Sequence, residues 1–241
     1  MSDEVSYPGR DLEAMAFAVN YHRWILDFFR PYLGRRIVEV GAGTGSFSEL
    51  ILEQPIESLT LIEPSRSMHE ALSRSMGRSR APAKLVLHNS TFRRVADQLQ
   101  SGQPPDSVVY VNVLEHIEDD EGELRVVYNT LGANGRVFLF VPAMQWLYSG
   151  FDRQMGHFRR YTKTELQDKC RRAGFRILKS AYFDRIGVLP WWIKYKLLRS
   201  DSMEPRSVRL YDQYAVPLSR HLESWIAPPF GKNVVLVAER S

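Results

Sequence analysis

Residues 36–46 read Arg-Ile-Val-Glu-Val-Gly-Ala-Gly-Thr-Gly-Ser, and an apolar helical pattern follows them. The β-branched run over 37–40 is typical of a buried strand. Gly41, Gly43 and Gly45 predict a turn between that strand and the helix. A glycine turn lets the backbone approach a ligand where any Cβ would clash, and it leaves free N–H groups beside the helix start. The stretch therefore predicts an α/β fold with a nucleotide pocket at this turn.

Two residues indicate which nucleotide the turn favours. The dinucleotide fingerprint G-x-G-x-x-G needs a third glycine at position 46, where this chain has Ser46. Glu39 lies just before the first glycine, where a carboxylate would repel a pyrophosphate and attract a cation. A nicotinamide oxidoreductase is therefore disfavoured, and a ligand with a positive charge is favoured.

A second acidic residue follows the next predicted strand. Residues 59–62 read Leu-Thr-Leu-Ile, and Glu63 comes directly after them, 22 residues beyond Gly41. An acid at about this distance suits the two ribose hydroxyls of a nucleotide as a bidentate acceptor. A helix-capping or surface carboxylate is the structural alternative for Glu63.

The rest of the chain continues the alternation of strand and helix patterns. Such an order is typical of a doubly wound sheet with helices on both faces. Further strands are expected at 84–88, 106–111 and 135–141, from 175 onward, and at 233–238.

Three motifs carry a resemblance to a known family. The E-x-G-x-G-x-G pattern over 39–45 resembles motif I of the class I S-adenosylmethionine (SAM) methyltransferases. The N-V-L-E-H-I run over 112–117 resembles the element after the fourth strand in ubiquinone- and menaquinone-type methyltransferases, and 131–135 is similar to their L-x-P-G-G turn. The resemblance spans residues 15–180 and the final strand. It implies a mostly parallel seven-stranded sheet with an antiparallel last strand, and SAM as the cofactor.

The resemblance also implies which residues bind the cofactor. In the family, the acid of motif I lies near the ammonium of the cofactor's methionine part, so Glu39 is expected there. Gly41, Gly43 and Gly45 are expected against the cofactor, and Glu63 on its ribose.

Further cofactor contacts are expected around the adenine and the methionine part. The family usually has an acid after the third strand for the adenine amino group, and Asn89 or Ser90 would replace it here. Asn112, which begins the N-V-L-E-H-I run, is expected among the binding residues. A helix predicted over 11–31 would cover the methionine end, where Tyr21 or Arg23 could bind the cofactor carboxylate.

Composition limits the class of protein. A chain of 241 residues with 44% hydrophobic content suits one domain with additions. Cys170 is the single cysteine, so neither a disulfide framework nor a cysteine-based metal site is expected. No signal peptide or transmembrane run is recognisable, which predicts a cytoplasmic protein. We expect four segments along this domain. A cap helix spans 1–34, a cofactor-binding core spans 35–183, a helical lid or acceptor insertion spans 184–232, and a last strand spans 233–241.

Charge is unevenly distributed along the chain. Residues 1–149 hold 14 Lys and Arg against 19 Asp and Glu, whereas residues 150–210 hold 15 against 6. Residues 211–241 balance at 3 and 3. A basic segment at the ligand-binding edge of the sheet predicts an anionic partner. That partner could be a small molecule, an acidic protein, a membrane surface or nucleic acid.

The densest polar stretch is Gly-His-Phe-Arg-Arg-Tyr-Thr over 156–162. Thr162 and Glu165 form a capping-box pattern, so a helix should begin there and leave the stretch in a loop over the methyl group. His157 is the predicted general base, because its ordinary pKa suits proton transfer. A histidine that only holds the loop is the alternative. Tyr161 is predicted as a second catalytic residue, with Arg160 orienting the acceptor.

Residues 184–232 form an insertion before the last strand. Its apolar and aromatic run over 189–199 contains interleaved lysines. Such a run is typical of a lid with buried tryptophans, of an interfacial membrane helix or of a protein-docking face. No RNA-binding module is recognisable, so nucleic acid is disfavoured.

These patterns predict a SAM-dependent methyltransferase that acts on an O or N nucleophile. The expected acceptor is an anionic small molecule or a lipid-linked metabolite, with peripheral membrane contact as an option. A lysine N-methyltransferase acting on an acidic protein is the first alternative, and a SAM-binding protein without activity is the second. No metal-ligand cluster is recognisable in the sequence, so no metal site is expected.

Overall fold

The structure is a computed structural model that describes residues 18–78 and 82–241. Residues 11–17 of the helix predicted over 11–31 lie outside the described residues. Its described part is α2, Val19–Phe29, followed by one 3-10 turn, η1, Arg30–Tyr32.

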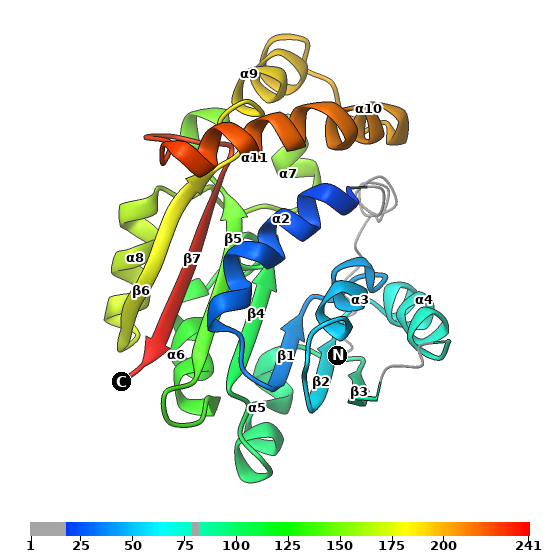
Figure 1. Ribbon diagram of the computed structural model, residues 1–241, viewed down its shortest axis with the longest axis vertical. Helices are drawn as coiled ribbons and strands as arrows, with labels where there is room; N and C mark the ends of the chain where they lie inside the picture. Colours follow the sequence, from blue (N-terminus) through cyan, green and yellow to red (C-terminus); the bar gives the residue numbers. More distant parts are fainter. Residues whose placement is uncertain (1–17, 79–81) are drawn as a thin grey trace.

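A seven-stranded sheet in the order β3-β2-β1-β4-β5-β7-β6 forms the centre of the fold (Figure 1). Strands β1 to β5 run parallel, and β7 lies antiparallel between β5 and β6. The predicted mixed sheet with an antiparallel last strand is therefore confirmed. The strands are β1 Arg36–Val40, β2 Ser58–Ile62, β3 Lys84–His88, β4 Ser107–Val111, β5 Arg136–Pro142, β6 Phe175–Phe183 and β7 Asn233–Arg240.

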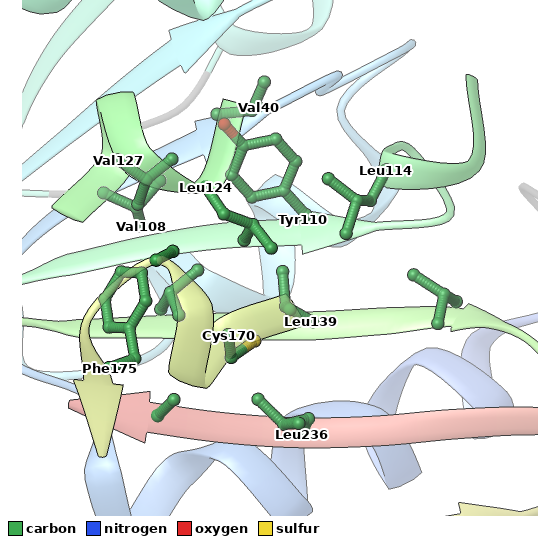
Figure 2. Packing of buried hydrophobic residues seen from close by; sticks show 14 of the residues in the cluster. Val40, Val108, Tyr110, Leu114, Leu124, Val127, Leu139, Cys170, Phe175 and Leu236 are labelled. Carbon is green, nitrogen blue, oxygen red and sulfur yellow. The ribbon is translucent and has the colours of Figure 1, made fainter. Parts of the chain in front are cut away.

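Helices cover both faces of this sheet because its central strands are apolar on both sides. Along β4, Val108 and Tyr110 pack with α5, α6 and α8, whereas Val109 between them packs with α2, α3 and α4. Figure 2 shows the first of these layers, in which Leu124 of α6 lies beside Tyr110 and Cys170 of α8 lies beside Leu139 of β5. The helices that follow α2 along the core are α3 Ser46–Leu52, α4 Arg66–Met76, α5 Phe92–Ser101, η2 Leu114–His116, α6 Asp120–Thr130, η3 Gln145–Leu147, α7 Gly150–Gln154 and α8 Lys163–Arg172.

The predicted capping box begins α8. The Thr162 hydroxyl accepts a hydrogen bond from Glu165 N at 3.1 Å, and Thr162 N donates to the Glu165 carboxylate. The stretch over 156–162 therefore lies in the connection between β5 and α8, as predicted.

A helical insertion connects β6 to β7 and lies at the end of the molecule where the parallel strands end (Figure 1). Its first part is α9, Val188–Trp191, continued by a π-helical stretch, η4, Trp192–Leu197. Its second part is one continuous helix made of α10 Pro205–Leu210, η5 Tyr211–Ala215 and α11 Val216–Trp225. No helix in the described part of the chain is long and apolar enough to cross a membrane.

The basic segment is partly neutralised within the fold. Lys169 of α8 pairs with Asp120 at 3.0 Å, Arg172 pairs with Glu121 at 2.7 Å, and Arg176 of β6 pairs with Glu239. These pairs neutralise part of the positive charge that the sequence places over 150–210, because acids of α6 and β7 face the cations of α8 and β6.

Candidate functional site

A cavity of about 490 Å³ lies at the carboxyl ends of β1, β2, β4 and β5. This volume is within the range of small-molecule sites. Among the predicted site residues, Tyr21, Glu39, Gly41, Gly43, Glu63, Asn112 and His157 line the cavity, and Gly45, Asn89 and Tyr161 do not.

The glycine turn after β1 has left-handed backbone geometry. Gly41, Gly43 and Gly45 have φ of +69°, +56° and +95°, which glycine adopts without steric cost. A Cβ on Gly45 would lie 2.9 Å from Met76 Cε, so this glycine lets α3 and α4 pack closely. Gly41 and Gly43, in contrast, bring their backbone to the cavity wall.

Glu39 is a buried carboxylate at the cavity wall. Its Oε2 accepts a hydrogen bond from Ser48 Oγ of α3 at 2.6 Å. Burial raises the pKa of Glu39 to about 8, with a further small effect of the nearby Glu63. A buried carboxylate of this kind favours a cation beside it, because the ionised form then regains the stabilisation that water gave it.

Glu63 connects the end of β2 to the glycine turn. Its Oε2 accepts from Gly43 N at 2.8 Å, and its Oε1 accepts from Ser65 N at 2.9 Å. Burial raises its pKa above the ordinary value, although these two bonds act in the opposite direction. Each oxygen keeps lone-pair capacity for a further donor, such as a ligand hydroxyl.

Asn89 stabilises the loop after β2. Its Nδ2 donates to the carbonyls of Glu63 at 2.9 Å and Pro64 at 3.1 Å. The neighbouring Ser90 lines the cavity together with Met68. Ser90, rather than Asn89, therefore faces the region where the resemblance places the adenine.

Tyr21 of α2 lies in the cavity wall, and its hydroxyl donates to Asn233 Oδ1 at 3.0 Å. Arg23 lies outside the wall, in a surface ion pair with Glu53 at 3.9 Å. Lys232 lies over Tyr21, with its Nζ 4.8 Å from the tyrosine ring centroid. Sequence analysis did not identify Lys232 as a site residue.

Asn112 directly follows β4 and has a left-handed backbone at φ +54°. Its N–H donates to the carbonyl of Phe140 at 2.8 Å, and the residue lines the cavity. Asparagine tolerates this geometry better than branched residues.

His157 is oriented by a buried aspartate. The distance between His157 Nδ1 and Asp152 Oδ1 is 3.0 Å, and Asp152 also accepts from Arg160 Nε at 2.7 Å. Burial acts to raise the pKa of Asp152, but the bonds from His157 and Arg160 hold it below the ordinary value. The ionised Asp152 therefore favours the tautomer with the proton on Nδ1, which leaves Nε2 as the acceptor.

Glu115 lies in the same part of the cavity wall, and sequence analysis did not select it. Its side chain is fully buried, and neither carboxylate oxygen has a hydrogen-bond partner among the described residues. Burial raises its pKa to about 7. Its place in the N-V-L-E-H-I run, directly after β4, was the available sequence signal.

Glu115, His116 and His157 form a group that could hold a metal ion. One ligand atom from each lies within 4.8 Å of the others. Burial lowers the pKa of His116 to about 3, so its ring is neutral. One carboxylate and two imidazoles suit Zn²⁺ and other divalent transition metals, and this convergence was not expected from the sequence.

Tyr161 points away from the cavity into the core. Its hydroxyl lies 2.8 Å from Asp120 Oδ2 and 3.3 Å from the carbonyl of Leu114. Burial, followed by the charge of Asp120, raises its pKa above the ordinary value. In this placement Tyr161 supports η2, the turn that carries Glu115 and His116.

Comparisons with known proteins identify the family of the chain and its fold. A sequence profile described as "Methyltransferase domain" matches residues 14–180. A SAM-dependent methyltransferase from Archaeoglobus fulgidus has a TM-score of 0.60 at 17% identity, and the match covers 89% of this chain and 90% of that chain. Comparison with curated proteins finds no match.

Two further solved structures share the fold. A cyclopropane synthase from Mycobacterium tuberculosis has a TM-score of 0.58 at 12% identity, with 89% of this chain and 82% of that chain covered. The magnesium protoporphyrin IX methyltransferase of Synechocystis, solved with bound SAM, has a TM-score of 0.55 at 12% identity, over 96% and 82% of the two chains. Since the family profile covers more than half of the sequence, the chain belongs to the methyltransferase-domain family and is a class I SAM-dependent methyltransferase.

Proposed function

We propose that this enzyme transfers the methyl group of SAM to an O or N nucleophile of an anionic small molecule or a lipid-linked acceptor in the cytoplasm. The observation that carries the proposal is one cavity whose wall contains two chemically different groups of residues. The glycine turn, Glu39 and Glu63 line one part of the cavity, and His157, which Asp152 holds from behind, lines another.

The first group fits the chemistry of the cofactor. Buried Glu39 would face the ammonium of the methionine part, whose charge compensates the cost of ionising a carboxylate there. The two oxygens of Glu63 would accept from the ribose hydroxyls, and Ser90 would lie beside the adenine. Bound SAM supplies a methyl group on a sulfonium, which is a good leaving group.

The second group would orient the acceptor and take its proton. Alignment of the acceptor atom with the methyl group can contribute about 7–11 kcal/mol to the lowering of the barrier. His157 Nε2 would receive the proton of a hydroxyl or ammonium acceptor, while Asp152 holds the ring in place. Arg160 and Lys232 also line the cavity, but Arg160 pairs with Asp152 at 2.7 Å and Lys232 pairs with Asp184 at 2.9 Å. The proposed negative charge of the acceptor therefore rests on the excess of cations over 150–210.

Calorimetric titration with SAM, S-adenosylhomocysteine and NADH tests the cofactor part of the proposal. We expect micromolar binding of the first two and none of the third. Absence of SAM binding to the folded protein would contradict the cofactor assignment.

Incubation of a cell lysate with labelled SAM tests the acceptor part. Label in the lipid or small-molecule extract would support the proposed acceptor. Label in a protein band would favour the alternative, a lysine of an acidic protein docked on the basic insertion.

Replacement of Glu63 by alanine should weaken SAM binding by about 1.5–3 kcal/mol, because two charge-assisted hydrogen bonds to the ribose are lost. Glu49→Ala is the matched control, since the Glu49 carboxylate is exposed and accepts only from Ser75 in the described structure. Calorimetry on both variants measures the effect. An unchanged affinity in Glu63→Ala would remove Glu63 from the ribose site.

SAM affinity should depend on pH through Glu39. Its pKa of about 8 in the free protein means that the carboxylate is mostly protonated below that pH. A cationic ligand binds the ionised form, so affinity should rise by up to about tenfold per pH unit as the pH rises from about 6 to about 8. Glu39→Gln should bind more weakly and lose this pH dependence, and a wild-type slope in that variant would assign the titration to another group.

A further inference from the structure

The outer face of the insertion carries two apolar stripes that no other part of the described chain covers. Along the continuous helix over 205–225, the exposed apolar residues recur every four or three positions, so they lie on one side of it. They are Leu210, Tyr214, Leu218, Leu222 and Trp225, and Trp225 is 78% exposed.

The first helix of the insertion has a similar outer stripe and a different inner face. Its exposed apolar residues are Leu189, Trp192, Ile193, Leu197 and Leu198, and the last of these is 70% exposed. On the inner face, Tyr195 packs on Phe151 with ring centroids 4.4 Å apart, and Trp191 lines the cavity. The inner face of this helix therefore fits the expected lid, because Trp191 lines the cavity there. Its outer face carries the exposed apolar stripe.

The acidic and basic side chains of the insertion differ in how exposed they are. Residues 188–226 hold six Lys and Arg against four Asp and Glu. Two of the acids point inward: Asp212 accepts from the N–H groups of Asn20 and Tyr21, and Glu223 accepts from two backbone N–H groups that follow β6. Four exposed cations, Lys196, Arg199, Arg206 and Arg209, therefore outnumber the two exposed acids, Asp201 and Glu204.

We infer that the insertion binds an anionic lipid surface through the two apolar stripes and their flanking cations. Apolar residues next to tryptophan, tyrosine and basic side chains are the composition of an interfacial helix. Basic side chains are attracted to anionic lipid headgroups. A second copy of this chain fits less well, since a two-fold interface would bring the same cations of both copies together.

This inference deepens the proposed function by naming where the acceptor comes from. A single helix diameter separates the cavity from the outer surface of the insertion. Trp191 lies on the inner face of this helix, and Trp192 and Leu197 lie on its outer face. A lipid-linked acceptor could then enter the cavity from the bilayer without crossing open water. The membrane contact itself needs no cofactor, so it can be tested separately from methyl transfer.

Sedimentation with vesicles tests the inference in the absence of SAM. The wild-type protein should bind vesicles of phosphatidylglycerol and phosphatidylcholine in equal parts, and should bind pure phosphatidylcholine vesicles far more weakly. Lys196→Gln with Arg199→Gln should lower the partition coefficient by about 25-fold at low ionic strength, at about fivefold for each cation. Arg125→Gln with Arg171→Gln, on α6 and α8, is the matched control and should bind as the wild type does.

A second pair of variants tests the apolar stripes. Leu197→Gln with Leu198→Gln, and separately Leu218→Gln with Leu222→Gln, should each lower the partition coefficient by about tenfold or more. All four leucines are exposed, so the fold and calorimetric SAM affinity should be unchanged. No binding to anionic vesicles by the wild type, or equal binding by all variants, would overturn the inference. A dimer in light scattering that these leucine variants dissociate would also overturn it, because a second copy would then occupy the face.

Discussion

His157→Ala is expected to lower kcat by about 10²–10⁴ while SAM affinity stays as in the wild type. The reason is the position of the imidazole, whose Nδ1 faces the ionised Asp152 at 3.0 Å while the residue lines the cavity. Without it, an acceptor that carries a proton has no base in contact. Single-turnover rates with labelled SAM, next to calorimetric SAM binding, separate chemistry from cofactor affinity.

Asp152→Asn tests the positioning of the histidine. The variant keeps the size of the side chain but would favour the wrong tautomer of His157, so kcat should fall. The thermal unfolding temperature reports any loss of the Arg160 contact.

Unchanged turnover in His157→Ala would return the histidine to a role in holding the loop. A divalent metal that is present in the purified protein, and that both His157→Ala and Glu115→Gln lose, would show that His157 is a ligand instead of a base.

Gly43→Val is expected to abolish SAM binding. Gly43 has φ +56°, a region that β-branched residues avoid, and its N–H donates to Glu63 at 2.8 Å. A left-handed backbone costs an L-residue about 1–2 kcal/mol, and the added side chain would in addition occupy space at the cavity wall.

Gly45→Ala is the control for this glycine variant. Gly45 has the same left-handed geometry but packs against Met76 and does not line the cavity. It should therefore lower the thermal unfolding temperature while leaving SAM affinity nearly unchanged. Wild-type SAM affinity in Gly43→Val would show that the turn does not contact the cofactor.

Local patterns were sufficient to predict the sheet and one wall of the site. Strands such as β1 and β4 are β-branched runs that end before Gly41 and Asn112, and their carboxyl ends meet at one edge in any parallel sheet. Glu39 and Glu63 could be found because each is adjacent in sequence to such a strand end.

The other wall depends on side-chain direction, which the pattern does not determine. Arg160 and Tyr161 are neighbours, yet the guanidinium lines the cavity and the phenol points into the core. Asn89 and Ser90 are also neighbours, yet Ser90 lines the cavity and Asn89 donates to backbone carbonyls of the loop after β2. The count of charges could not show that α8 pairs with α6, because that contact forms only when the helices pack together.

Lys232 could have been predicted from the topology alone. An antiparallel last strand begins at the edge where the parallel strands end, so the residue before β7 must lie at the mouth of the site. The same reasoning places Asn233, the partner of the Tyr21 hydroxyl, at this edge.

The carboxylate of Asp212 links two functions that are far apart in the sequence. Asp212 belongs to η5, below the outer stripe that contains Tyr214, and it accepts from Asn20 N at 3.0 Å and Tyr21 N at 2.9 Å. A displacement of η5 on a bilayer would be transmitted through these bonds to the start of α2, whose Tyr21 lines the cavity. Lipid contact and cofactor occupancy then share one free energy of coupling. By reciprocity, the factor by which a bilayer changes SAM affinity equals the factor by which SAM changes bilayer affinity.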